Sequence, residues 1–233
     1  MSKPEDQGAV FLNGEGDRWF SRNAAVISSP EQIRRDLPLR VLGLSPSYKP
    51  RRILEIGCST GWRLAALRAR YECSVTGVEP SASAIEEGKR LYGAEFDLRR
   101  GLSSDLPIPA EETFDLVVCA YMLHWVSRHA LLRTVAEIDR VLANGGHLII
   151  NDFFPDVAQR RKYHHLEDGQ AFTYKQDLAA LFVGTNLYRH VARTTGPHEP
   201  KTDDLLTMTR LDSGDRIVCD VLQKDLSVYV DAG

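Results

Sequence analysis

An acidic side chain stands two positions before the first glycine of a small-residue turn at residues 51–61, Arg-Arg-Ile-Leu-Glu-Ile-Gly-Cys-Ser-Thr-Gly. An apolar strand that ends in such a turn lets backbone N–H groups approach a ligand closely. Phosphate-binding loops use similar glycines, but a carboxylate beside them would repel a pyrophosphate. A ligand with a positively charged group reverses that sign. Glu55 and the turn therefore indicate a site for a cationic nucleoside cofactor.

Further polar or small residues follow the ends of later apolar runs. Glu79 ends the second run and is followed by Pro80, and a carboxylate in that place can accept both hydroxyls of a ribose. Residues 101–103 (Gly-Leu-Ser) and 120–125 (Ala-Tyr-Met-Leu-His-Trp) follow the third and fourth. Ligands of open parallel sheets bind outside the carboxyl ends of the strands, so these segments predict one shared site. Taken singly, each is also compatible with a structural turn, a helix cap or a core residue.

The elements that position these residues alternate between buried apolar runs and helical stretches. The predicted strands are 53–57, 74–79, 95–99, 114–120 and 147–151, and the predicted helices are 62–71, 82–92 and 128–142. Crossovers of helical length between strands imply a parallel sheet covered on both faces. We therefore predict a doubly wound, Rossmann-like α/β fold.

The flanking segments follow less regular patterns. A helix is predicted from Ser29 to Gly43, a short one at 176–182, and a closing antiparallel pair at 187–193 and 216–222. The segment 205–211 is ambiguous. Residues 1–17 are polar and glycine-containing, which predicts a flexible N-terminal arm with order starting near residue 18. We expect residues 18–233 to form one domain, with 153–176 as an insertion on the substrate side.

Composition narrows the class of protein. The 233 residues carry a net charge of −3 and no dense basic run, which argues against a nucleic-acid partner. The four cysteines are widely spaced, and we expect them to be reduced and buried. No apolar stretch approaches the roughly 20 residues of a membrane span. These features favour a cytoplasmic protein without membrane insertion, as a monomer or homodimer.

The order of the motifs carries more information than any one of them. Acid-x-Gly-x-Ser-x-Gly is followed by Glu79-Pro80, then Leu-Pro before Phe-Asp-Leu-Val-Val, Leu-His-Trp-Val, and Arg-Val-Leu-x-x-Gly-Gly. In this order the chain resembles the class I S-adenosylmethionine-dependent methyltransferases, strongly over about residues 50–152 and weakly at the termini. The resemblance implies a mainly parallel seven-stranded sheet with its last strand antiparallel, S-adenosylmethionine as the cofactor, and a small-molecule acceptor.

The resemblance also implies roles for residues matched by position. The methionine half is expected near Glu55, Gly57, Ser59 and Gly61, and the ribose near Glu79 and the following Pro80. The adenine edge is expected at Leu102 and Ser103, the sulfur near Ala120 and Tyr121, and the N-terminal lid at Trp19, Phe20 and Arg22. Two residues depart from the family pattern. Ser59 replaces a glycine and suits its place if its backbone angles are ordinary, and Leu102 replaces the acid that usually contacts the adenine amine.

Methyl transfer by in-line displacement requires alignment of donor and acceptor, and a hydroxyl acceptor also benefits from a general base. His124, His164 and His165 are the candidates. The segment around Tyr163 and Tyr174 resembles insertions of methyltransferases from surface-glycan and sugar-nucleotide pathways, although a solvated loop is an equal alternative. We expect no metal, because the adjacent histidines would point to opposite sides of an extended chain.

Two other functions are compatible with parts of this pattern. A nicotinamide-dependent oxidoreductase would require Gly-x-Gly-x-x-Gly, and Trp62 stands at its last glycine. A non-catalytic methyltransferase-like scaffold is the stronger alternative, because Ser59 and Leu102 depart from the pattern. The expected function is methyl transfer to a hydroxyl of a sugar, sugar nucleotide or secondary metabolite.

Overall fold

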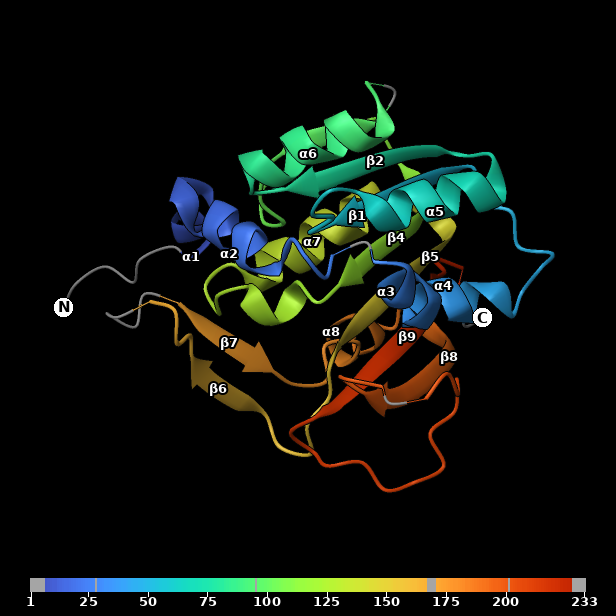
Figure 1. Ribbon diagram of the computed structural model, residues 1–233. Helices are drawn as coiled ribbons and strands as arrows, with labels where there is room; N and C mark the ends of the chain where they lie inside the picture. The colour runs from blue at the N-terminus through green and yellow to red at the C-terminus, as the bar shows by residue number, and fades with distance from the viewer. Residues whose placement is uncertain (1–6, 28, 95, 167–170, 201, 228–233) are drawn as a thin grey trace.

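The computed structural model describes residues 7–27, 29–94, 96–166, 171–200 and 202–227. At its centre is a seven-stranded sheet with the spatial order β3-β2-β1-β4-β5-β9-β8 (Figure 1). The strands are β1 Arg52–Ile56, β2 Ser74–Glu79, β3 Asp97–Arg100, β4 Phe114–Ala120, β5 Leu142–Phe153, β8 Tyr188–Pro197 and β9 Arg216–Lys224.

Strands β1 to β5 run parallel, and β9 lies antiparallel between β5 and β8. The predicted seven-stranded α/β fold with its last strand antiparallel is confirmed. The strand order reverses between β1 and β4, so the carboxyl ends of these two neighbours border the expected ligand site. The start predicted for the third strand, Glu95, lies outside the described residues.

Helices cover both faces of the sheet because alternate strand residues point to opposite sides. Ile53 packs in the cluster that faces α4 and α5, whereas Leu54 packs in the cluster that faces α7 and α8. The helices are α1 Gln7–Val10, η1 Phe11–Glu15, α2 Gly16–Asn23, α3 Pro30–Arg35, α4 Leu37–Gly43, α5 Trp62–Tyr71, α6 Ala82–Tyr92, η2 Leu123–Trp125, α7 Leu131–Val141 and α8 Ala180–Val183.

The N-terminal region differs from the prediction that order starts near residue 18. Residues 7–17 are helical, and the side chains of Gln7 and Glu15 are buried. Their polar groups bond to residues far along the chain, which a local composition pattern does not reveal. Flexibility of the first residues and the division into domains stay predictions.

The helix predicted over 29–43 is two helices. Asp36 has an extended backbone (ψ 115°) and caps α4 by accepting a hydrogen bond from the Leu39 N–H. Pro38 lies in the first turn of α4, where its missing N–H costs nothing, but inside one continuous helix it would remove a hydrogen bond and clash with the preceding turn. The chain therefore restarts its helix at Asp36.

The segment after β5 contains an antiparallel ribbon that the sequence pattern did not predict. Strands β6 (Gln159–Lys162) and β7 (Phe172–Lys175) pair with each other and project beside the main sheet (Figure 1). The short helix predicted at 176–182 is the one-turn α8. All four cysteines are free and buried, which confirms that prediction.

Candidate active site

The turn after β1 has the unusual backbone that its small residues suggested. Gly57, Ser59 and Gly61 have φ of +74°, +51° and +78°. A Cβ on Gly57 would lie 2.7 Å from Cβ of Met122, so glycine is required for packing as well as for φ. Serine was expected to suit this place only if its backbone angles were ordinary, and the φ of Ser59 shows that they are not. The left-handed region costs a non-glycine residue about 1–2 kcal/mol.

Glu79 fastens this turn to the next strand. Its Oε2 accepts a hydrogen bond from the Ser59 N–H at 2.9 Å, and its Oε1 accepts one from the Ser81 N–H at 3.0 Å. Burial raises the pKa of Glu79 to about 7, against the lowering effect of these two N–H groups. Glu79 as a residue is half-buried, and each carboxylate oxygen keeps a lone pair. This arrangement fits two ribose hydroxyls.

Glu55 is committed to a buried ion pair that the sequence analysis missed. Arg63 on α5 donates to Oε1 of Glu55 and to both carboxylate oxygens of Asp36, and all three side chains are at most 5% exposed. Burial raises the pKa of Glu55 to about 7; Asp36 adds to the rise, whereas Arg63 opposes it. Arg63 therefore shares one positive charge between two buried carboxylates, Glu55 and Asp36.

Buried side-chain oxygens nevertheless lack partners at this edge, one each from Glu55, Ser59, Thr60 and Asn151. Oε2 of Glu55 and Oγ of Ser59 form no hydrogen bond, although buried polar atoms are normally paired. Together with Glu79, they provide acceptors for an amino group and for ribose hydroxyls. The residues present thus fit S-adenosylmethionine at its methionine and ribose portions. Only the assignment of individual contacts remains a prediction.

Pro80 follows β2, and the two residues predicted at the adenine edge, Leu102 and Ser103, follow β3. The Pro80 carbonyl accepts a hydrogen bond from Nε of Arg100, and Leu102 forms an isolated bridge with Asp105. The Ser103 hydroxyl is 3.1 Å from the hydroxyl of Thr134 on α7. Ser103 is thus held by the protein, and the contacts of these residues with a cofactor stay predictions.

His124 forms the clearest catalytic arrangement in the structure. Its Nδ1 lies 2.7 Å from Oδ1 of Asp152, and its backbone N–H donates to Oδ2 of the same carboxylate. The two side chains are 4% and 1% exposed. Asp152 is the penultimate residue of β5, and His124 lies in η2 after the neighbouring β4, so the pairing of β4 with β5 brings them together. A carboxylate that accepts from Nδ1–H leaves Nε2 as the basic nitrogen.

His164 and His165 lie elsewhere, on the exposed face of the turn after β6. Their ring centroids are 3.9 Å apart, so the prediction that the two rings point to opposite sides is wrong: a turn, not an extended chain, carries them. Tyr163 is the residue that points inward, at 5% exposed. The geometry favours His124 over these two as a base.

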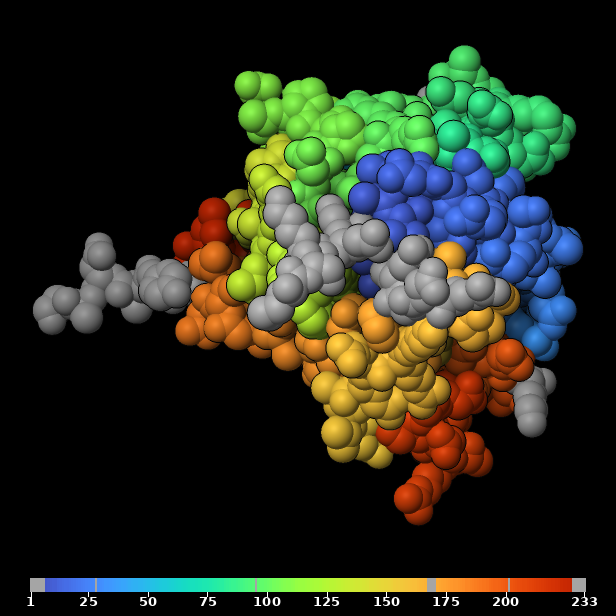
Figure 2. Space-filling view, turned by 90° about the vertical axis from the view of Figure 1, so that its left-hand side faces the viewer, coloured from blue at the N-terminus to red at the C-terminus, as the bar shows by residue number. Residues whose placement is uncertain are grey.

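The N-terminal helices cover the edge of the sheet next to these residues. Arg22 donates to Oε1 of the fully buried Glu15 and to the hydroxyl of Tyr163, which itself donates to Glu15. Although burial raises it, hydrogen bonds from Arg18, Arg22 and Tyr163 hold the pKa of Glu15 below its usual value. Figure 2 shows this blue segment between the green residues around 100 and the yellow ribbon. The half-buried Trp19 and Phe20 belong to the same cover.

An aromatic group continues outward from His124. Tyr121, His124, Phe153 and His198 are joined by ring contacts with centroid distances of 4.9 to 6.1 Å, and Nζ of Lys175 lies 3.3 Å from the Phe153 centroid. Ala120, buried at the end of β4, leads into Tyr121, whose φ is +54°. Sequence analysis missed Asp152, Phe153 and His198; a carboxylate directly after the fifth strand was the available signal.

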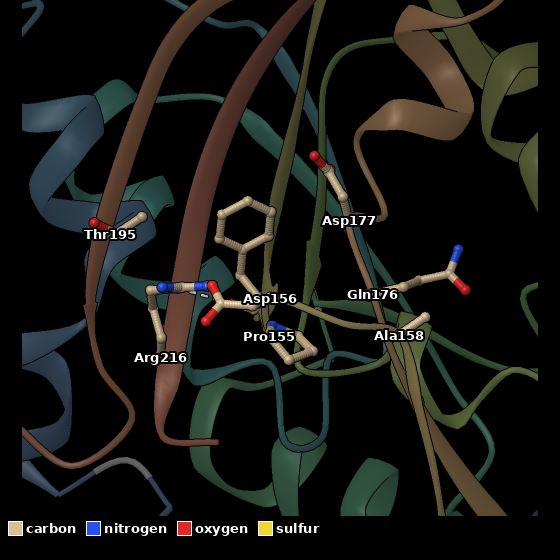
Figure 3. Close-up of a pocket in the computed structure, with 8 residues that line it drawn as sticks. Pro155, Asp156, Ala158, Gln176, Asp177, Thr195 and Arg216 are labelled. Carbon is tan, nitrogen blue, oxygen red and sulfur yellow. Dashed lines mark hydrogen bonds and ion pairs between the residues drawn. The ribbon is translucent and has the colours of Figure 1, made fainter. Parts of the chain in front are cut away.

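Two surface pockets lie beside this region. One of about 610 Å³ is lined by residues such as Gln176, Asp177, Thr195 and Arg216 (Figure 3), and the other, of about 470 Å³, lies between α2 and α6 next to Thr60. Neither includes Glu79 or His124. In the described ranges, no three His, Cys, Asp or Glu side chains gather to hold a metal ion, and no helix is long and apolar enough to cross a membrane.

Comparison with known proteins agrees with this geometry. Residues 54–150 match the family model described as a methyltransferase domain, and they include the turn, Glu79 and His124. The chain carries a methyltransferase domain. The predicted recognition of the class I S-adenosylmethionine-dependent methyltransferases is thereby confirmed.

Curated relatives of the methyltransferase domain share modest identity with it. Malonyl-[acyl-carrier protein] O-methyltransferase of Halalkalibacterium halodurans is 23% identical over 172 residues, which cover 69% of this chain and 60% of the relative. The 27-O-demethylrifamycin SV methyltransferase of Amycolatopsis mediterranei is 31% identical over 129 residues, covering 53% and 46%. The chain thus spans three fifths or less of each of these relatives.

The fold is also that of a solved methyltransferase. The 1,6-didemethyltoxoflavin-N1-methyltransferase of Burkholderia thailandensis, solved with 1,6-didemethyltoxoflavin and S-adenosylhomocysteine, superposes with a TM-score of 0.70. The match covers 97% of this chain and 92% of that chain at 16% identity. At that identity the likeness shows the fold alone.

Proposed function

We propose that this protein transfers a methyl group from S-adenosylmethionine to an oxygen of a small-molecule acceptor, a hydroxyl of a sugar, sugar nucleotide or secondary metabolite. The observation that carries the proposal is the buried pair of His124 and Asp152 beside the strand ends that also hold Glu79. A hydroxyl is a weak nucleophile at neutral pH, and a positioned base makes it a better one.

The protein's own groups then have distinct tasks. Asp152 accepts from Nδ1–H of His124 and fixes the ring and its tautomer. Nε2 takes the proton of the acceptor hydroxyl as the oxygen forms its new bond to carbon. When bound, the cofactor would supply an electrophilic methyl group on a sulfonium, whose carbon–sulfur bond would break in the transfer and leave S-adenosylhomocysteine. The N-terminal helices exclude water from this edge, which strengthens the electrostatic interactions inside it.

The relatives support oxygen as the acceptor atom. Two of them, the malonyl-[acyl-carrier protein] and 27-O-demethylrifamycin SV enzymes, are O-methyltransferases by name or by the position they modify. Their acceptors differ widely, so they support the reaction class rather than a particular acceptor. The contact set around Glu79 supports S-adenosylmethionine independently of those names.

Calorimetric titration of cofactor-free protein with S-adenosylmethionine and, separately, with NADH tests the proposal. We expect saturable binding of S-adenosylmethionine alone. Glu79→Ala should abolish it while the thermal transition is retained, because the ribose acceptors and the anchor of the Ser59 turn are removed together. Glu111→Ala, an exposed acid outside the site, is the matched control and should bind normally.

The titration also separates the alternatives. Binding of neither ligand would overturn the enzyme proposal and favour a methyltransferase-like scaffold. Binding of NADH alone would point to an oxidoreductase. Binding of S-adenosylmethionine justifies a screen of hydroxylated acceptors, with S-adenosylhomocysteine formation as the readout.

A further inference from the structure

Lys175 is a half-buried cation for which the described structure supplies no counter-ion. It ends β7, and its Nζ lies 3.3 Å from the centroid of Phe153. Burial lowers the pKa of Lys175, and Arg161 lowers it further, while Asp152 and Asp215 oppose this. In the described part of the chain no carboxylate forms an ion pair with Nζ. An aromatic face compensates a desolvated ammonium only in part.

The nearest buried acid is not available to neutralise Lys175. Oδ1 of Asp152 lies 2.7 Å from Nδ1 of His124 and accepts a hydrogen bond from the backbone N–H of Phe153 at 2.8 Å. Its Oδ2 accepts the backbone N–H of His124 at 3.2 Å. Asp152 thus orients the base, and in the described residues it forms no ion pair with Nζ of Lys175. The ammonium of Lys175 can therefore form a direct ion pair with an external anion.

The side chains around Lys175 form a continuous line of contacts from the surface to the base. His198 is exposed, Tyr121 and Phe153 are half-buried, and His124 is 4% exposed at the inner end. The ring of Phe153 contacts both histidines, with centroid distances of 5.1 Å to His124 and 4.9 Å to His198. The ammonium of Lys175 lies against this line of side chains at Phe153, so an acceptor that approaches His124 from the His198 side meets it.

We infer that Lys175 binds an anionic group of the acceptor, and that Phe153 and His198 pack against the acceptor beside that group. This inference rests on the proposed function and narrows its substrate class to hydroxylated molecules that also carry a carboxylate or another anion. The anionic group fixes the acceptor, and a separate hydroxyl of the same molecule faces Nε2 of His124. Lys175 is thus a specificity-determining residue, whereas His124 acts on the reacting atoms.

The β6·β7 ribbon carries Lys175 at one end and a second lysine at the other. Lys175 pairs with Gln159 in the β6·β7 ladder, at the end of the ribbon that joins the main sheet (Figure 1). Lys162 lies at the opposite end of the same ladder, paired with Phe172, and is exposed. The two lysines share ribbon and charge but not position, which makes Lys162 the matched control.

The test uses full-length protein saturated with S-adenosylhomocysteine and four matched pairs of probes. These are 2-, 3- and 4-hydroxybenzoate with their carboxamides, and L-malate with its diamide. We expect at least one acid to bind roughly tenfold or more tightly than its amide, because a charge-assisted hydrogen bond is lost in the amide. Lys175→Met should abolish that preference, Lys175→Arg should keep most of it, and Lys162→Met should leave it unchanged.

Turnover gives a second readout on any acid that is methylated. Lys175→Met should raise KM at least tenfold with kcat within about threefold, the pattern for loss of uniform binding. Equal binding of every acid and its amide by the wild-type protein would overturn the inference, as would an acid preference that survives in Lys175→Met. Failure of the proposed function has a different signature, since S-adenosylhomocysteine would then not bind. Lys175→Gln repeats the comparison if the methionine variant does not fold.

Discussion

The two halves of the site are built in different ways. The proposed cofactor half draws Glu55, the Gly57–Gly61 turn and Glu79 from one strand-turn-helix-strand unit that is continuous in sequence. The proposed acceptor half draws His124, Phe153, Lys175 and His198 from four separate segments. A contiguous unit constrains its residues through backbone geometry. A dispersed group is held by side-chain contacts, which leaves it free to vary with the acceptor.

This difference assigns different measurements to the two halves. Changes in the cofactor half should alter cofactor binding or stability, because its residues also hold the turn and the core. Changes in the acceptor half should alter turnover and acceptor affinity and leave the cofactor bound. The predictions below test that separation.

The largest expected effect is on turnover. His124→Gln removes the base. Asp152→Asn keeps His124 in place, but the amide no longer favours the tautomer of His124 that carries its proton on Nδ1. We expect each to lower kcat by about 10²- to 10⁴-fold. The Kd for S-adenosylmethionine should change less than threefold by calorimetry. Turnover within fivefold of wild type in His124→Gln would remove His124 from the role of base.

The next effect is on stability. Arg63→Met leaves Glu55 and Asp36 buried without their cation, and breaking such a group costs about 3–5 kcal/mol. Arg52→Met removes the more exposed pair with Glu112 and should cost less than about 1 kcal/mol. Urea unfolding measures both. The loss in Arg63→Met should be larger at pH 8 than at pH 5, where Glu55, whose pKa is raised to about 7, can take up a proton; equal losses in the two variants would contradict a structural role for Arg63.

A pH effect follows from Glu79, whose pKa is raised to about 7 in the folded protein from 4.5. The folded state then binds more protons than the unfolded chain, so the unliganded protein loses stability as pH rises through about 4.5 to 7. Cofactor binding should have the opposite trend, because the ionised carboxylate accepts ribose hydroxyls better.

Two series measure these trends. Affinity for S-adenosylmethionine should rise by roughly tenfold between pH 6 and pH 8, as the ionised fraction of a group with this pKa does. Glu79→Gln should bind more weakly and flatten both the affinity profile and the stability profile. An unchanged slope in the variant would assign the pH dependence to another group.

The smallest effect concerns Ser59. Its φ of +51° favours glycine, so Ser59→Gly should raise the free energy of unfolding by up to about 1 kcal/mol, less the greater entropy of glycine in the unfolded chain. Ser83→Gly, in the exposed first turn of α6, should lower it instead. A destabilised Ser59→Gly variant would show that the serine hydroxyl contributes more than the backbone costs.

The same contrast explains what the sequence could predict. The strands around Ile53, Val78 and Val118 are mostly apolar, and Glu79 stands at the carboxyl end of one of them, so local patterns were sufficient for the sheet and the cofactor half. Arg63 escaped prediction because a charged residue on a helix is usually solvated, and its burial depends on Asp36 from a distant helix. His198 follows β8 in an irregular loop, and its place in the site depends on its ring contact with Phe153, which the sequence pattern does not show.

Gln7, in the N-terminal cover, is bonded to residues that are synthesised much later. The side-chain amide of Gln7 donates to the carbonyls of Trp125 and Phe172 and accepts from the Phe172 N–H, across 165 residues. At about 5–20 residues per second, the ribosome needs roughly 8–33 s to make the chain between Gln7 and Phe172. The first helices to be made are therefore among the last to reach their native contacts, and until then the strand edge they cover is accessible to chaperones.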